Sequence, residues 1–171
     1  GQIALPWGLP PPALAALRLP QPSSAVRGTQ ILGALVLDMG ADAATLAGPD
    51  AALRGVTLTS SSYASNAGAV GSVEVRFVDG GVIVYDVVQG RDTNSWQAAD
   101  CSACRVALRW HKRLDKLGRS AYPAAWHDFT ARAFATELRW GQSRRVAAIR
   151  LRSVHSATGQ WWVWQVVPIE R

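Results

Sequence analysis

Alternation of apolar and polar residues over positions 72–88 constrains the fold more than any other feature of this sequence. From Ser72 to Val78, valine and phenylalanine alternate with serine, glutamate and arginine, as in a strand with one buried face. Asp-Gly-Gly at 79–81 is typical of a tight turn, and 82–88 returns as a mainly β-branched run. The pattern predicts a β-hairpin.

A second hairpin is predicted at the end of the sequence. Segments 145–154 and 161–169 have strand composition, and the residues between them, His-Ser-Ala-Thr-Gly-Gln, have turn composition. Both faces of 161–169 are largely apolar, so we expect both to be covered.

Three other segments are predicted to be helical. Residues 29–47 have apolar side chains at i, i+4 spacing, although 31–38 alone also fits a buried strand. Residues 101–117 separate an apolar stripe from a basic one at helical spacing. Residues 123–139 begin with proline at a natural first helical position and end before Gly141.

This order of elements predicts an α+β fold. We expect an antiparallel sheet of four to six strands, including the two hairpins, with helices packed on one face. The alternative is an all-β sandwich or jelly-roll-like arrangement, because 105–111 also alternates apolar and polar residues, as a strand would.

The 171 residues are expected to form one domain preceded by an arm. Residues 1–28 contain six of the nine prolines together with many apolar side chains, a composition expected to pack on a neighbouring subunit. Residues 29–171 are the predicted domain. The longest apolar runs, 31–37 and 161–167, are too short for a transmembrane helix, and the compartment is left open because the sequence starts at Gly1.

Charge is divided unevenly along the chain. Residues 1–100 carry five Arg against eight acidic residues, whereas 101–171 carry thirteen Lys and Arg against four. A basic half predicts an anionic partner, with nucleic acid as the first choice and an acidic protein surface as the second. The candidate anion-binding residues lie on the predicted basic helix and on the strand of the second hairpin: Arg105, Arg109, Lys112, Arg113, Lys116, Arg144, Arg145, Arg150 and Arg152.

Seven of the eight tryptophans lie between residues 96 and 164, interleaved with arginines. Aromatic rings flanked by Arg are how single-stranded nucleic acid is stacked and neutralised, but tryptophan is more often a core residue. The candidate stacking residues are Trp110, Trp140, Trp162 and Trp164.

Cys101 and Cys104 form a CxxC pair at the start of the predicted basic helix. A helix N-terminus and a neighbouring arginine lower the pKa of a thiol, so a redox dithiol is one interpretation. Half of a zinc site, completed by His111 and His127, is another. A short-range disulfide or two structural thiols is the favoured one, and no metal site or cofactor is assigned.

The sequence predicts a non-catalytic interaction or structural module of a larger assembly, whose basic half contacts an anionic partner. No GxSxG, Walker A, GxGxxG or HExxH motif is present, and no catalytic residue is assigned. The alternative is a small enzyme, either a CxxC thiol-disulfide oxidoreductase or a basic nuclease or hydrolase using His111, His127 and His155.

Overall fold

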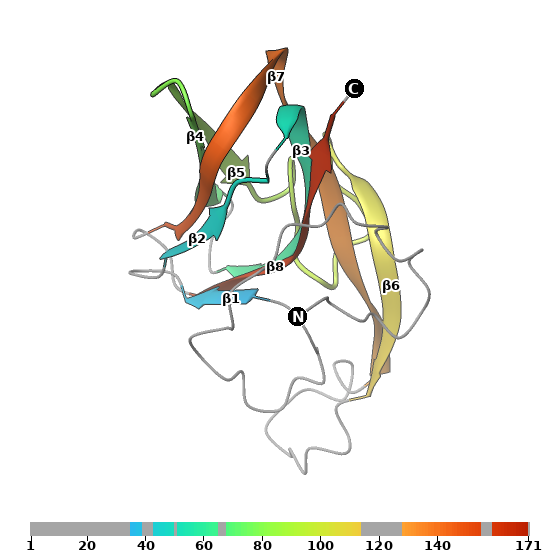
Figure 1. Ribbon diagram of the computed structural model, residues 1–171. Helices are drawn as coiled ribbons and strands as arrows, with labels where there is room; N and C mark the ends of the chain where they lie inside the picture. Colours follow the sequence, from blue (N-terminus) through green and yellow to red (C-terminus); the bar gives the residue numbers. More distant parts are fainter. Residues whose placement is uncertain are drawn as a thin grey trace.

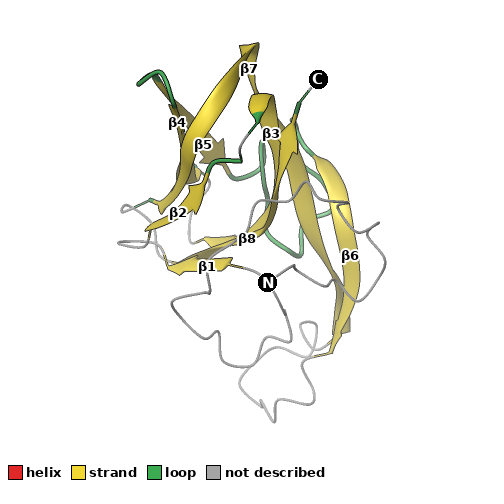
Figure 2. Cartoon of the chain, in the orientation of Figure 1, coloured by secondary structure: helices red, strands yellow, loops and turns green. Residues whose placement is uncertain are grey.

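The structure, a computed structural model, describes residues 35–38, 43–49, 51–64, 68–113, 128–154 and 159–170. All regular structure in these ranges is β-strand (Figure 2). One antiparallel sheet contains eight strands: β1 (Leu35–Asp38), β2 (Ala43–Ala47), β3 (Ala52–Ala64), β4 (Ala69–Phe77), β5 (Val82–Val88), β6 (Arg105–Arg113), β7 (Asp128–Ser153) and β8 (Gly159–Ile169). The fold is therefore all-β in the part of the chain that is described.

The predicted α+β fold with four to six strands is wrong. The segment expected as the basic helix forms β6, the helix expected over 123–139 contributes the first half of β7, and 29–47 contains β1 and β2. Helical spacing was not decisive, because several of these segments also alternate: Thr136, Leu138 and Trp140 are buried, while Glu137 and Arg139 between them are exposed. Each segment finds a hydrogen-bonded strand partner, and tertiary pairing overrides helical spacing.

The first predicted hairpin is confirmed, because β4 and β5 pair antiparallel from Ala69 opposite Val88 to Arg76 opposite Val82. The second is wrong. Strand β8 is present, but it pairs with β1 and β3 instead of the C-terminal half of β7. Both edges of that half are already occupied by β2 and β4, which leaves no edge for β8.

The 26-residue strand β7 runs through both halves of the sheet (Figure 1). Its N-terminal half lies between β6 and β3, and its C-terminal half lies between β4 and β2. The pairing with β3 skips from Leu53 opposite Arg144 to Gly55 opposite Arg139, so residues 140–143 of β7 lie opposite Arg54 alone. A bulge of this kind bends a strand, and here it lets one strand continue through both halves of the sheet.

The two halves of the sheet pack on a shared hydrophobic core. Buried leucines, valines and aromatic residues from β1, β2, β3, β4, β5, β7 and β8 form one cluster. Gly71 of β4 lies against the ring of Trp161 of β8: a Cβ at Gly71 would come 2.6 Å from that ring. Because Trp161 is fully buried, this close approach sets the distance between the halves.

The predicted arm, residues 1–28, lies outside the described residues, so its expected docking on a neighbouring subunit stays a prediction. Within the described ranges, no helix is long and apolar enough to cross a membrane.

Substitution Gly71→Ala is expected to destabilise the protein, because the added methyl group collides with a buried ring that has no room to move. Overpacking of this kind costs about 1–3 kcal/mol in the free energy of unfolding, measured by urea denaturation. Gly141→Ala is the matched control, since a Cβ there meets no atom within 4 Å. Equal stability of the two variants would contradict the packing of β4 against β8.

Candidate anion-binding face

The C-terminal half of β7 presents alternate residues to the core and to the outside. Ile149 and Leu151 are buried in the shared core, whereas Arg150 is half-buried and Arg152 exposed on the opposite face. This alternation follows from the two-residue period of a strand with one face covered. Two of the predicted anion-binding residues are thereby placed on one outer surface.

Cross-strand pairing brings a third arginine to the same surface. Residues directly opposite each other in adjacent strands share a face. Three rows cross β2, β7 and β4: Ala43, Arg152, Ser72; Thr45, Arg150, Glu74; and Ala47, Ala148, Arg76. We call this surface the Arg face and define it by Arg76, Arg150 and Arg152.

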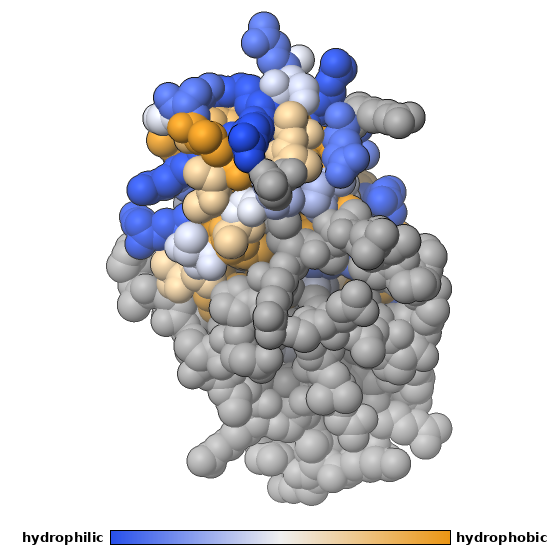
Figure 3. All heavy atoms as spheres, in the orientation of Figure 1, coloured by the Kyte–Doolittle hydropathy of each residue, from blue (hydrophilic) through white to orange (hydrophobic). Residues whose placement is uncertain are grey.

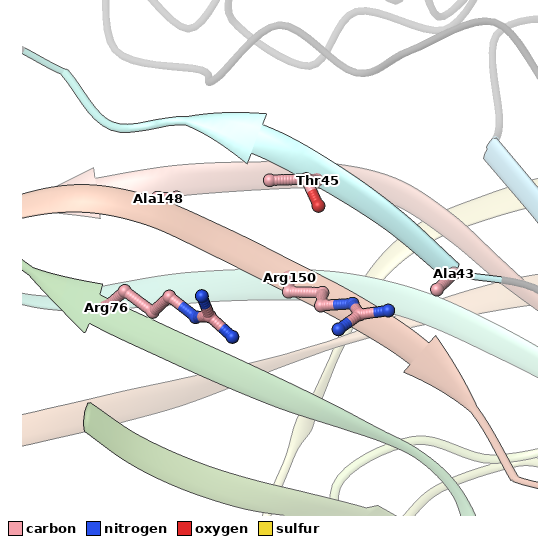
Figure 4. Close-up of a pocket in the computed structure, with 5 residues that line it drawn as sticks. All are labelled: Ala43, Thr45, Arg76, Ala148 and Arg150. Atoms are coloured by element: carbon pink, nitrogen blue, oxygen red, sulfur yellow. The ribbon is translucent and has the colours of Figure 1, made fainter.

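A shallow hollow of about 230 Å³ lies on the Arg face. Figure 4 shows Arg76 extending from β4 and Arg150 from the neighbouring β7, with Thr45 on β2 beyond them. The rest of the lining is Ala43 and Ala148, whose small side chains leave space beside the two guanidinium groups. The hollow is thus a depression in which two guanidinium groups lie beside small, largely apolar side chains.

The Arg face stabilises negative charge. The pKa of Glu74 lies below its ordinary value, chiefly because Arg76 hydrogen bonds to its carboxylate and in addition because Arg76, Arg150 and Arg152 are positively charged. Glu74 accepts from Arg76 Nε, and Asp86 of β5 lies opposite Ser72 on the same face, so two carboxylates offset part of the charge of the three guanidinium groups. The hydrogen bond from Arg76 belongs to Glu74, whereas the positive charges of Arg150 and Arg152 act on any group at this position.

Arg144 has a different role from the one the sequence suggested. Its guanidinium donates to both carboxylate oxygens of Asp79, with Nη2 2.7 Å from Oδ1, and stacks 3.6 Å from the centre of the Phe77 ring. These contacts join β7 to the turn between β4 and β5. Arg145 is exposed and lies opposite Ala52 in β3, away from the Arg face.

The predicted basic helical stripe is not formed over 105–113, because Arg105, Arg109, Lys112 and Arg113 belong to strand β6. Arg105 and Arg109 are exposed on β6, on either side of an irregularity in its pairing with β7. The side chains of Lys112 and Arg113 are not described, and Lys116 lies outside the described residues.

Three of the four candidate stacking residues are buried. Trp140 is 5% exposed and donates to the Leu53 carbonyl at 2.7 Å. Trp164 is 1% exposed and donates to Ser61 Oγ at 2.8 Å, and Trp162 packs edge-on against Trp96. A stacked base needs an open ring face, so these positions lend no support to stacking. The side chain of the fourth, Trp110, is not described.

Cys101 and Cys104 are joined in a disulfide. It lies in the segment 89–104, which crosses from β5 to β6 and inserts between β3 and β7: Ser62 N–H donates to the Asn94 carbonyl, and Arg132 N–H donates to that of Trp96. Both cysteine sulfurs are therefore bonded to each other, and neither is a free thiol in this structure. In the described part of the chain, no three His, Cys, Asp or Glu residues come together as metal ligands.

Arg76 is not among the anion-binding residues that the sequence predicts. The sequence pattern places it on the polar side of the first hairpin, but its place beside Arg150 depends on the long-range pairing of β4 with β7. The signal available was the outward position of Arg76 in an alternating strand. On the side of the molecule shown in Figure 3, hydrophilic and hydrophobic residues are interspersed over the described part.

Comparison of the chain with known protein families, curated proteins and solved structures finds no match. The fold and its surfaces therefore carry the functional argument.

Substitution Asp79→Asn tests the structural role of Arg144. Hydrogen bonds from Arg144 and from the Gly81 N–H hold the pKa of Asp79 below its ordinary value of 3.8. A lowered folded pKa contributes stability above pH about 4, and that contribution is lost as the pH falls through the folded pKa. The variant should be less stable at pH 7 and should lose less stability between pH 7 and pH 3.

Urea midpoints at the two pH values measure this difference. Asp100→Asn is the control, because the exposed Asp100 side chain has no ion pair among the described residues. An identical pH dependence for wild type and Asp79→Asn would show that the contact between Arg144 and Asp79 does not stabilise the fold.

Proposed function

We propose that this chain is a non-catalytic interaction module that binds an anionic partner on its Arg face. The observation that carries the proposal is the hollow between Arg76 and Arg150, which unites arginines from two strands over a floor of small side chains. Guanidinium groups bind carboxylate and phosphate oxygens in a bidentate manner and stay charged at every physiological pH.

Nucleic acid is the first choice of partner, bound through its phosphates. Arg150 and Arg152 are two residues apart on one strand face, about 7 Å by the rise of an antiparallel strand, so they are placed to contact successive anionic groups. The buried tryptophans favour contact with the backbone over contact with the bases. Such binding is insensitive to sequence and strongly dependent on salt.

The enzyme alternatives receive no comparable support. An oxidoreductase needs a dithiol that exchanges with its disulfide. A structural role is supported here because the disulfide lies in a segment that is hydrogen bonded to both β3 and β7. A nuclease using histidines stays a prediction, because the side chain of His111 is not described and His127 and His155 lie outside the described residues.

The triple variant Arg76→Gln/Arg150→Gln/Arg152→Gln is expected to remain folded and to bind a generic single-stranded oligonucleotide more weakly. The slope of log affinity against log salt should become shallower by about 0.7 for each lost phosphate contact, or about 2 in total. Fluorescence anisotropy over a series of salt concentrations measures this slope.

The matched control removes the same charge elsewhere. Arg54, Arg105 and Arg109 are exposed, and changing all three to Gln leaves the Arg face intact. The control should retain the wild-type slope. No binding by the wild type at low salt, or equal losses in the two triple variants, would refute the proposed site.

A further inference from the structure

Strand β5 ends the order of strands in the sheet, and β4 is its one partner among the described strands. Its inner side is firmly anchored. Ile83 and Tyr85 pack against the shared core, and the Tyr85 hydroxyl donates to the Arg139 carbonyl at 2.8 Å. Strand β5 therefore presents its other edge from a rigid position.

The register determines which backbone groups point toward that edge. Phe77 N–H donates to the Gly81 carbonyl at 2.8 Å, so Phe77 and Gly81 occupy a hydrogen-bonded position at the start of the ladder. The Phe77 carbonyl accepts from Gly80 N–H instead. Antiparallel pairs alternate between bonded and non-bonded positions. The residues whose N–H and C=O groups point away from β4 are therefore Val82, Val84 and Asp86. Val88 lies beyond a shift in the register, and its N–H also points away from β4, because it donates to Asp92.

The C-terminal part of the edge is capped within the chain. Val88 N–H donates to Asp92 Oδ2 at 2.9 Å, and Arg91 Nη2 donates to the Asp86 carbonyl at 3.0 Å. Arg91 Nε also donates to Asp92 Oδ2, which holds the two caps together. The caps satisfy these backbone groups and block an added strand at this end.

The N-terminal part of the edge, among the described residues, is not paired with another strand. In the described part of the chain, the outward backbone groups of Val82 and Val84 have no partner. Their side chains are 54% and 57% exposed on the outer face. Protected edges carry lysine, proline or a bulge, and the segment from Val82 to Val84 has none of these.

We propose that this open edge pairs with the same edge of a second copy of the chain, antiparallel about a two-fold axis at Ile83. Val82 of each copy then lies opposite Val84 of the other, and each such pair exchanges both N–H···O bonds. The outward valines meet as cross-strand β-branched pairs, which stabilise a sheet.

The second copy is the occupant that this edge fits, because the open segment is self-complementary. It is uncharged and has the same residue type at the two positions that would face each other. A longer register centred on Val84 would need the Asp86 carbonyl, which Arg91 already occupies. The cap therefore selects the short symmetric register.

An edge this short buries less than the roughly 1,200 Å² of a stable interface, so the dimer is weak and depends on concentration. Sedimentation equilibrium between about 10 µM and about 1 mM spans the range expected for such an association. The wild-type mass should rise from monomer toward dimer. A monomer mass across the whole range would overturn the proposal.

Two variants separate edge pairing from other association. Val82→Lys/Val84→Lys sets like charges opposite each other and should remain monomeric. Val78→Lys/Gln142→Lys adds the same charge at exposed positions outside β5 and should associate as the wild type does. Association of the first variant at wild-type strength would contradict the proposal.

Val84→Pro tests the backbone directly. Its N–H points away from β4, so proline removes an outward donor and leaves the β4 ladder intact. We expect a folded monomer, with folding verified by the near-ultraviolet circular dichroism of the tryptophans. A variant that folds and still dimerises would exclude pairing through this edge, and the outcome is independent of anion binding on the Arg face.

Discussion

Hydrogen bonding along both edges of β7 is the constraint on which the rest of the structure depends. Two pairs of strands reach the sheet through this one strand, β6 and β3 along its first half and β4 and β2 along its second. The unpaired residues 140–143 permit the change of partners. Trp140, at the start of this bulge, is held by a hydrogen bond to the Leu53 carbonyl and by an edge-on contact with Phe77. The bend is thus fixed by buried contacts.

The position of the Arg face follows from this arrangement. Once Ile149 and Leu151 enter the shared core, the strand period turns Arg150 and Arg152 outward. The neighbouring strand β4 then supplies Arg76, and β2 supplies side chains too small to cover the guanidinium groups. Glu74 offsets part of the positive charge, and its lowered pKa reflects the hydrogen bond from Arg76 as well as the positive charges of Arg150 and Arg152.

The Arg face and the open edge of β5 are related by the sheet that carries both. A two-fold axis perpendicular to the sheet keeps the outer faces of two copies on the same side. In the proposed dimer, two Arg faces would therefore flank the joined β5 strands. A long polyanion spanning both would gain affinity through effective concentration, even though each face and the dimer contact are individually weak.

The sequence by itself determined the first hairpin and the strand at 161–169 with both faces covered, because turn composition and the pattern of apolar residues are local properties. It did not determine helix against strand at 105–113 or 128–139, since both periodicities fit the same side chains. The union of Arg76 with Arg150 and the unpaired edge at Val82 and Val84 in the described part of the chain were decided by the tertiary structure alone. Each depends on which distant strand pairs with a given strand edge. Every non-proline residue offers the same backbone donor and acceptor, so the local sequence does not specify that choice.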